Sequence, residues 1–351
     1  MALALSEHYP GVSALSVAGI ASLPTPLEPL QIEQVLEKGC ELWVKRDDAT
    51  YALYGGNKVR KLDFLLGQAL AEHKTAVVTF GAYGSNHALA TAVHARALGI
   101  EPHIIMSPQA PTAFARDTLL AHAGLNTQLH PIEGWEGERE AKRVIHELAE
   151  RDGMQPAVFP MGGSSALGAV GFVNAAAEVG AGFDAVYVPC GTLGTAVGLA
   201  VGFAALGANT RVVAVRVTPA ELANGHVART LTEGVVTLMG SVDARFPRLA
   251  FENLAFDLRD EFFEPGYAVP TAATEAAVAL AARSGLALET TYTGKALQAL
   301  ETDVRLGTLS GGKILFWDTY HSGPKPPPGP VEVLPPTLQE YVAECEQRFG
   351  R

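Results

Sequence analysis

The sequence is poor in cysteine and has no excess of basic residues. Cys40, Cys190 and Cys345 are an odd number at wide spacing with no CxxC motif, so neither a disulfide framework nor a zinc site is indicated. The 26 basic and 37 acidic residues give a formal charge of −11, which argues against a general nucleic-acid binder, because such a surface would be basic. We expect a small-molecule ligand and a reducing, cytoplasmic location.

The sequence also lacks the signals of export and of membrane insertion. Its N-terminus contains Glu7 and has no basic residue before the apolar run, unlike a signal peptide. Residues 185–210 carry no charge and are long enough to cross a bilayer. Five glycines and Pro189 in this stretch favour a buried strand, a glycine loop and a core helix, since a helix on a parallel sheet can be apolar all round. We therefore expect a soluble protein.

Three common ligand-binding motifs are missing. No GxGxxG is present, which removes the main signal for a nicotinamide dehydrogenase. Residues 307–314, GTLSGGKI, nearly fit a phosphate loop, but Ile314 stands where Ser or Thr would bind magnesium. His87 and His94 are seven residues apart, whereas a helical zinc pair needs a step of four. We predict no metal site and give a nucleotide little weight.

Short apolar runs alternate with helical patterns along most of the 351 residues, and the length suggests about two domains. Strands are expected at 40–45, 76–80, 103–106, 127–130, 157–159, 185–188, 211–217 and 313–317. Helices are expected at 85–98, 113–123, 137–151 and 337–348. This alternation predicts parallel βαβ units, hence an α/β fold of two parallel-sheet domains with a cleft between them and ligands at the carboxyl ends of strands.

One stretch, residues 45–70, combines a glycine turn with a cluster of basic residues. Gly55, Gly56 and Asn57 suit tight backbone, and the leucines that follow have helical spacing. Lys58, Arg60 and Lys61 then stand at a helix start, where the dipole disfavours positive charge. The cluster is either a solvated basic patch or a site in which Lys58 attacks a carbonyl carbon while its neighbours hold an anion.

Five motifs occur in a fixed order over roughly residues 24–323. They are VKRDDATYALYGGNKVRKLDFLL at 44–66, GSNH at 84–87, GGSSALGAVGFV at 162–173, GTLGTAVGL at 191–199 and YTGKAL at 292–297. Together they resemble the pyridoxal-phosphate enzymes of fold type II, specifically the D-cysteine desulfhydrase and aminocyclopropane-carboxylate deaminase family. The resemblance implies a tryptophan synthase β-like fold, with two three-layer domains and a cofactor cleft between them, and a homodimer.

The resemblance also suggests domain limits. Residues 1–60 and 165–323 would form the larger, cofactor-binding domain, and residues 61–164 the smaller one. Residues 324–351 lie beyond the family match; they contain KPPPGP and LPP, which predict a stiff linker, and then a short amphipathic helix. Docking of this extension on a partner subunit is one possible role.

The resemblance assigns the cofactor to Lys58, whose burial would supply the free amine that attacks carbon. Once released, Lys58 would act as the base at the substrate α-carbon. The loop of Thr192, Leu193, Gly194 and Thr195 lies between a predicted strand and helix, where backbone N–H groups favour a phosphate; an ordinary strand-to-helix turn is the alternative. The resemblance adds Lys61 as a second phosphate contact.

Four residues are assigned to the ring and the substrate by the resemblance. Asn86 would lie beside the phenolate oxygen, and Ser85 beside the substrate carboxylate or the reacting carbon, although both residues also suit a plain helix cap. Tyr292 and Tyr267 would lie near the substrate as hydrogen-bond or proton donors; core packing is their alternative.

Thr293 would face the pyridine nitrogen, where the deaminase branch has a carboxylate. A neutral hydroxyl leaves that nitrogen largely unprotonated, which favours loss of a β-substituent over transamination.

Three departures from the family pattern bear on selectivity. Leu193 stands where glycine is frequent, and Gly84 replaces a frequent glutamine. Residues 317–323, WDTYHSG, replace an HTGG-like segment that lines the substrate, so that an aspartate, a tyrosine and His321 are expected to alter the charge and volume of the pocket.

The sequence thus predicts a pyridoxal-phosphate lyase that converts a small amino acid of D configuration, such as D-cysteine, to a keto acid and ammonia by α,β-elimination. The alternatives are ring opening of aminocyclopropane carboxylate and a noncatalytic binding protein that keeps the fold.

Overall fold

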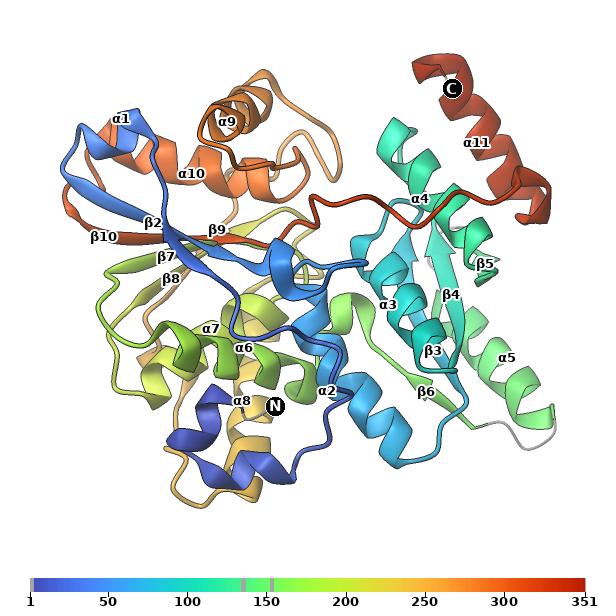
Figure 1. Cartoon of the computed structure of the whole chain (residues 1–351), viewed down its shortest axis with the longest axis horizontal. Coiled ribbons are helices and arrows are strands. Elements are labelled where there is room, and N and C mark those ends of the chain that lie inside the picture. The colour runs from blue at the N-terminus through green and yellow to red at the C-terminus, as the bar shows by residue number, and fades with distance from the viewer. Residues whose placement is uncertain (1–2, 134–136, 152–154, 351) are drawn as a thin grey trace. The chain divides into compact units, whose positions relative to one another are not determined.

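The computed structural model describes residues 3–133, 137–151 and 155–350, and these divide into two compact units (Figure 1). Unit 1 contains 3–15, Ala21–Phe64 and Ser164–Ser322. Unit 2 contains Ser16–Ile20, Leu65–Gly163 and 323–350. The segment predicted as a separate C-terminal part is therefore grouped with unit 2.

Unit 1 is built on a six-stranded sheet of order β1-β2-β10-β7-β8-β9. Its strands are Leu27–Pro29, Cys40–Arg46, Gly312–Asp318, Ala185–Cys190, Arg211–Arg216 and Phe256–Arg259, in that spatial order. Every neighbouring pair is parallel except β1 and β2, which are antiparallel. The expected parallel sheet is confirmed, and the two strands that the sequence did not indicate, β1 and β9, lie at its edges.

Helices cover both faces of this sheet. The helices are α1 (Glu33–Leu36), α6 (Ala166–Val179), α7 (Gly194–Ala205), α8 (Gly225–Val242), α9 (Ala272–Arg283) and α10 (Thr293–Leu306), and helix α2 (Lys58–Ala71) begins in unit 1. Along β7, Val186 and Val188 join one apolar cluster with α6, α7 and α8, whereas Ala185 and Tyr187 join another with α9 and α10. Burial on both faces explains why this strand needs no alternation of polar residues.

The charge-free stretch 185–210 is the predicted strand, loop and core helix, because it holds β7 and α7 and the loop that joins them. Within the described ranges, no helix is both long enough and apolar enough to cross a membrane.

Unit 2 has a four-stranded parallel sheet of order β5-β4-β3-β6. Its strands are Gln128–Pro131, Glu101–Ser107, Ala76–Ala82 and Pro156–Val158, and its helices are α3 (Asn86–Ala97), α4 (Ala113–Gly124), α5 (Gly137–Glu150) and α11 (Pro336–Phe349). Short 3-10 helices at Ala4–Glu7, Pro10–Ala14, Asp47–Thr50, Met161–Gly163, Phe251–Asn253 and Val331–Val333 complete the described elements of the chain.

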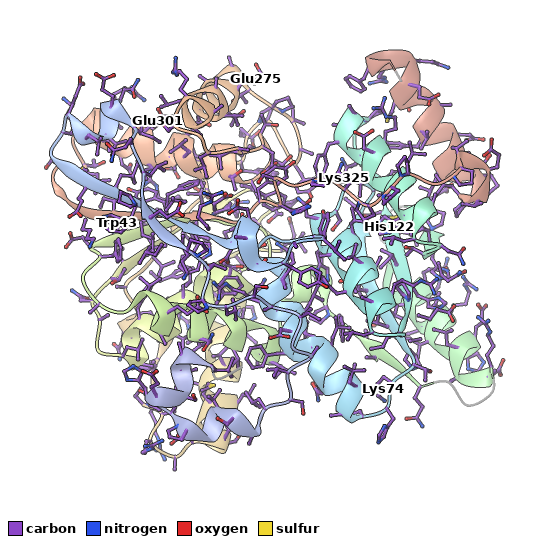
Figure 2. The ribbon with its side chains drawn as sticks, in the orientation of Figure 1. Trp43, Lys74, His122, Glu275, Glu301 and Lys325 are labelled. Carbon is purple, nitrogen blue, oxygen red and sulfur yellow. The ribbon has the colours of Figure 1, made fainter. Side chains whose placement is uncertain are left out.

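The C-terminal extension packs on its own chain. Leu338, Val342 and Cys345 of α11 share an apolar cluster with Leu119 and Ala123 of α4. The proline-rich segment before α11 is also fixed, because Lys325 (Figure 2) donates from Nζ to the carbonyl of Phe114 over 2.9 Å. The apolar face of α11 is thus buried within unit 2.

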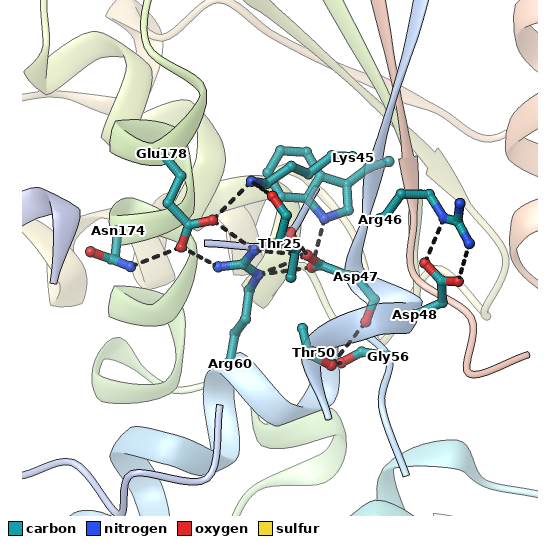
Figure 3. Close-up of polar contacts among 11 residues, drawn as sticks. Thr25, Lys45, Arg46, Asp47, Asp48, Thr50, Gly56, Arg60, Asn174 and Glu178 are labelled. Carbon is teal, nitrogen blue, oxygen red and sulfur yellow. Dashed lines mark hydrogen bonds and ion pairs between the residues drawn. The ribbon is translucent and has the colours of Figure 1, made fainter. Parts of the chain in front are cut away.

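A buried ionic cluster fixes the start of α2 to the sheet of unit 1 (Figure 3). Arg60 donates from Nε to both carboxylate oxygens of Asp47, over 2.9 and 3.0 Å, and from Nη1 and Nη2 to Glu178, over 2.7 and 2.9 Å. Lys45 pairs with the same glutamate at 2.9 Å. Trp317 of β10 donates its indole N–H to Asp47 over 2.7 Å.

Of the two alternatives for the basic cluster, the solvated patch is wrong, since Arg60 and Lys61 are buried. Arg60 does not serve as an anion site either, because two carboxylates of the chain already surround its guanidinium. Its role is structural: Asp47, held by Arg60, accepts the N–H of Gly56 at its carbonyl over 2.8 Å. Thr50 completes the turn by donating its hydroxyl to the carbonyls of Asp47 and Gly56, each over 2.8 Å.

We predict that Asp47→Asn lowers the free energy of unfolding by about 3–5 kcal/mol, because it removes one partner of a buried charge. Unfolding in urea measures the loss. Glu28→Gln is the matched control: it removes the exposed partner of Arg46 and should cost less than about 1 kcal/mol. Equal losses in the two variants would contradict a structural role for the cluster.

Candidate active site

The glycine turn before Lys58 is attached to the segment that follows β10. Gly56 has a φ of +89°, and a Cβ there would lie 3.0 Å from the carbonyl oxygen of Thr319, which explains glycine at this position. Asn57 donates its backbone N–H to that same carbonyl over 3.1 Å. His321 accepts the N–H of Gly55 at Nδ1 over 3.0 Å. The turn is therefore held from two sides, by the ionic cluster and by residues 319–321.

Three residues of the WDTYHSG segment are buried against the rest of unit 1. Trp317 is fully buried against Asp47, and His321 is buried against the ring of Tyr54 while it binds the glycine turn. Asp318 is buried as well, and burial, with Asp48 close by, raises the pKa of its carboxyl well above the usual range. Burial thus disfavours a charged carboxylate at this position, and the role of the segment toward the substrate stays a prediction.

Lys58 is the first residue of α2 and is held by its neighbour Asn57. Its Nζ donates to Asn57 Oδ1 over 2.8 Å, and Asn57 Nδ2 in turn donates to the hydroxyl of Thr195 over 3.1 Å. Burial lowers the pKa of Lys58 to about 8, with smaller opposing effects of Glu289 and Cys190. An amine with this pKa is neutral in an appreciable fraction of molecules near pH 7, so that it can act as a nucleophile or a base.

The loop from β7 to α7 has the form of an anion site. Leu193, the residue before α7, has the left-handed backbone (φ 67°), and its own side chain does not cap the helix. Ser164 and Thr192 place their hydroxyl oxygens 2.7 Å apart, and Lys61 Nζ donates to the Ser164 hydroxyl over 3.1 Å. A Cβ on Gly194 would lie 2.8 Å from Lys61 Nζ, so glycine lets the ammonium approach the helix N-terminus.

These groups fit the phosphate of pyridoxal phosphate. An ammonium, two hydroxyls and the positive end of a helix are the donors that a phosphate dianion requires. The backbone N–H of Gly194 already points to this place, because it donates to Ser164 over 3.2 Å. Burial, together with Lys58, lowers the pKa of Lys61, and a bound dianion would offset that cost. The alternative of an ordinary turn leaves this convergence of donors unexplained.

Two tyrosines lie beside Lys58. Tyr292 has its ring centroid 5.9 Å from Lys58 Nζ, and its hydroxyl lies 3.0 Å from that of Tyr267. The two rings meet edge to face at 6.0 Å. Burial raises the pKa of both phenols, so each remains a protonated donor at neutral pH. Both side chains are only partly buried, which argues against pure core packing.

Thr293 is buried, and its hydroxyl is bound to Glu289. The hydroxyl accepts the N–H of Glu289 over 3.0 Å and lies 3.2 Å from Glu289 Oε1. The same carboxylate accepts the N–H groups of Thr291, Tyr292 and Thr293 over 2.7, 2.8 and 2.9 Å. Glu289 thus caps α10 and fixes the backbone of Tyr292 and Thr293.

Ser85 and Asn86 belong to unit 2. Ser85 is the N-cap of α3 and accepts the N–H of Ala88 over 3.2 Å, as the capping alternative predicted, and Asn86 is the first helical residue. The roles of both residues toward the ring and the substrate stay predictions.

Sequence reasoning missed Asn57, Ser164 and Glu289 as site residues. The sequence indicates Asn57 only as a turn former, although it directly precedes Lys58. Ser164 lies within a recognised motif, GGSSALGAVGFV, so the motif located the segment without indicating which hydroxyl faces the phosphate loop. A carboxylate four residues before Thr293 was the available signal for Glu289.

Comparisons with known proteins agree with this geometry. Residues 21–319 match the family model described as pyridoxal-phosphate dependent enzyme. The D-cysteine desulfhydrases of Salmonella newport and Salmonella typhimurium are each 34% identical over 319 residues, covering 86% of this chain and 92% of theirs.

Solved structures show the same fold. An ACC deaminase homologue superposes with a TM-score of 0.78 at 25% identity, over 98% of this chain and 99% of that one. The processed form of threonine deaminase isoform 2 from Solanum lycopersicum has a TM-score of 0.60 at 19% identity, over 98% and 88%. With its lysine turn, anion site and two parallel sheets, this chain belongs to the pyridoxal-phosphate-dependent enzymes and has their type II fold.

Proposed function

We propose that this enzyme is a lyase that removes the β-substituent of a small amino acid, D-cysteine being the first candidate, and yields a keto acid and ammonia. Its basis is that Lys58, the anion site and the paired tyrosines all lie within unit 1. The names of the D-cysteine desulfhydrase relatives support the choice of substrate.

Pyridoxal phosphate, when bound, supplies an aldehyde for amines and a ring that withdraws electrons from the substrate α-carbon. Lys58 would hold it, and the phosphate would bind at one set of residues: Lys61, Ser164, Thr192, Leu193, Gly194 and Thr195. Asn86 and Thr293 are proposed for the ring. Lys58 also takes the α-proton, because its lowered pKa provides a neutral amine at the pH of the cytoplasm.

Tyr292 and Tyr267 assist the departure of the β-substituent. Tyr292 lies nearest to Lys58 and remains a protonated phenol, so it can donate a proton to the leaving β-substituent. Tyr267, hydrogen-bonded to it, orients that hydroxyl. Thr293, whose hydroxyl is bound to Glu289 in this structure, would present a neutral hydroxyl to the pyridine nitrogen. A neutral group there would favour β-elimination over ring opening of aminocyclopropane carboxylate. The proposal includes a cytoplasmic homodimer without nucleic-acid or membrane partners.

Lys58→Ala should abolish the visible absorbance of the bound cofactor and all turnover, because no other group replaces its amine in the turn. Lys38→Ala, which removes an exposed lysine of the same unit, is the matched control and should retain both. Absorption spectra after dialysis and keto acid assays give the comparison. Unchanged spectra and turnover in Lys58→Ala would refute the assignment.

Uptake of pyridoxal phosphate by the apoprotein should depend on pH through Lys58, whose pKa is lowered to about 8. Only the neutral amine attacks the aldehyde, so the second-order rate should rise about tenfold per pH unit below 8 and level off above it. Stopped-flow absorbance between pH 6 and 10 measures this. A rate that keeps rising to pH 10 would indicate an ordinary lysine.

A panel of substrates distinguishes the three candidate functions. Keto acid release is measured with D-cysteine, L-cysteine, D-serine, β-chloro-D-alanine and aminocyclopropane carboxylate. We expect release from D-cysteine and chloroalanine, which carry good β-leaving groups. Preference for the cyclopropane would favour ring opening instead, and a bound cofactor with no turnover on any compound would favour the noncatalytic binder.

A further inference from the structure

The loop that precedes α3 is held by the side chain of Gln109, which lies between β4 and α4. Gly84 donates its backbone N–H to Gln109 Oε1 over 3.0 Å. A Cβ on residue 84 would lie 3.1 Å from the Cβ of Ala115 and 3.2 Å from Gln109 Nε2, which is closer than most side chains tolerate. Glycine therefore fits this crowded position, and the amide of Gln109 reaches the loop from outside it.

Gln109 is itself in a segment held by the C-terminal helix. Tyr341 of α11 donates its hydroxyl to the carbonyl of Ala110, the residue after Gln109, over 3.0 Å. The segment then ends at Thr112, whose side chain accepts the N–H of Ala115 over 3.0 Å and caps α4. Residues 109–112 are therefore fixed at both ends, by α11 and by α4.

The ring of Tyr341 reaches the other side of the same loop. It packs edge to face on Tyr83, with ring centroids 4.8 Å apart, and both side chains are at least nine-tenths buried. Tyr83 also donates its N–H to the carbonyl of Ser107 at the end of β4 over 3.2 Å. One residue of α11 thus contacts the residue before Gly84 and the residue after Gln109.

The helix that carries Tyr341 is well anchored. Leu338, Val342 and Cys345 are buried with α4, and Gly329 donates its N–H to the carbonyl of Leu120 over 2.8 Å. The ammonium of Lys325 lies 3.5 Å from the ring centroid of Phe114, a cation–π contact that adds to its hydrogen bond. The C-terminal extension is therefore a fixed support from which Tyr341 can act.

We propose that Gln109 and Tyr341 are positioning residues for residues 83–86, and that they hold Ser85 and Asn86 in the conformation that binds the amino-acid substrate. This inference rests on the proposed function, which supplies the amino-acid substrate, and on the family resemblance, which assigns Ser85 to that substrate. Neither residue is catalytic. Gln109 holds the backbone of Gly84 from a neighbouring loop, and Tyr341 makes the C-terminal extension a support of the proposed substrate site.

Three full-length variants and a control test the proposal. Gln109→Ala removes the acceptor for the Gly84 N–H, Gln109→Glu restores an acceptor, and Tyr341→Phe removes the hydroxyl but keeps the ring. Gln347→Ala changes an exposed residue of the same helix and serves as the control. The readouts are hydrogen exchange of the amides of residues 83–88, cofactor absorbance, and KM and kcat for D-cysteine.

Gln109→Ala and Tyr341→Phe should each speed exchange of the loop and raise KM about 2- to 10-fold, the worth of one hydrogen bond, while absorbance and kcat stay near the parent values. Gln109→Glu should recover the slow exchange of Gly84. The control should match the parent throughout.

Exchange and KM unchanged in both Gln109→Ala and Tyr341→Phe would overturn the proposal. A fall in cofactor absorbance equal to the loss of activity would also overturn it, because the effect would then be on the fold as a whole. If the parent turns over no amino acid, the proposed reaction fails, but faster exchange of residues 83–88 in the two variants would still support the positioning role.

Discussion

The buried guanidinium of Arg60 is the constraint on which the site of unit 1 depends. A buried positive charge is tolerated only when it is paired with negative groups. Asp47 and Glu178, from two distant parts of the chain, pair with Arg60 in this way. Because Asp47 follows β2 directly and Arg60 lies two residues after Lys58, their pairing fixes the distance from the sheet to the lysine. Lys45 balances the second carboxylate, so the cluster contains two positive and two negative groups. The glycine turn between them is completed by hydrogen bonds to Thr50 and to residues 319–321.

The sequence predicted the parallel sheets well, because strands buried on both faces appear as charge-free runs. It missed β1 and β9 for the opposite reason. Both are short edge strands, β1 ends in a proline, and β9 alternates charged with apolar residues. With three and four residues, these segments are too short to stand out by pattern, and their strand conformation comes from pairing with a neighbour.

The sequence indicated those residues of the candidate site that lie together in one contiguous motif. Lys58 and the loop of residues 192–195 each lie within one contiguous motif. The unfavourable positive charges at the start of α2 were a further signal for Lys58. The residues alone could not separate the roles of Arg60 and Lys61, since Glu178, one partner of Arg60, is 118 residues away and Ser164, a partner of Lys61, is 103 residues away. Ser164 remained hidden for the same reason, because its contact with Thr192 exists only after β7 and α6 have packed.

The contact between Thr293 and Glu289 limits how this enzyme can evolve. The threonine hydroxyl lies 3.2 Å from a carboxylate that already caps α10. A glutamate introduced at position 293 would bring a second acid beside the first, and two like charges at that spacing cannot both ionise freely. A carboxylate at position 293, placed beside the ring nitrogen, would therefore require a substitution of Glu289 as well. We expect positions 289 and 293 to change together among descendants of this enzyme.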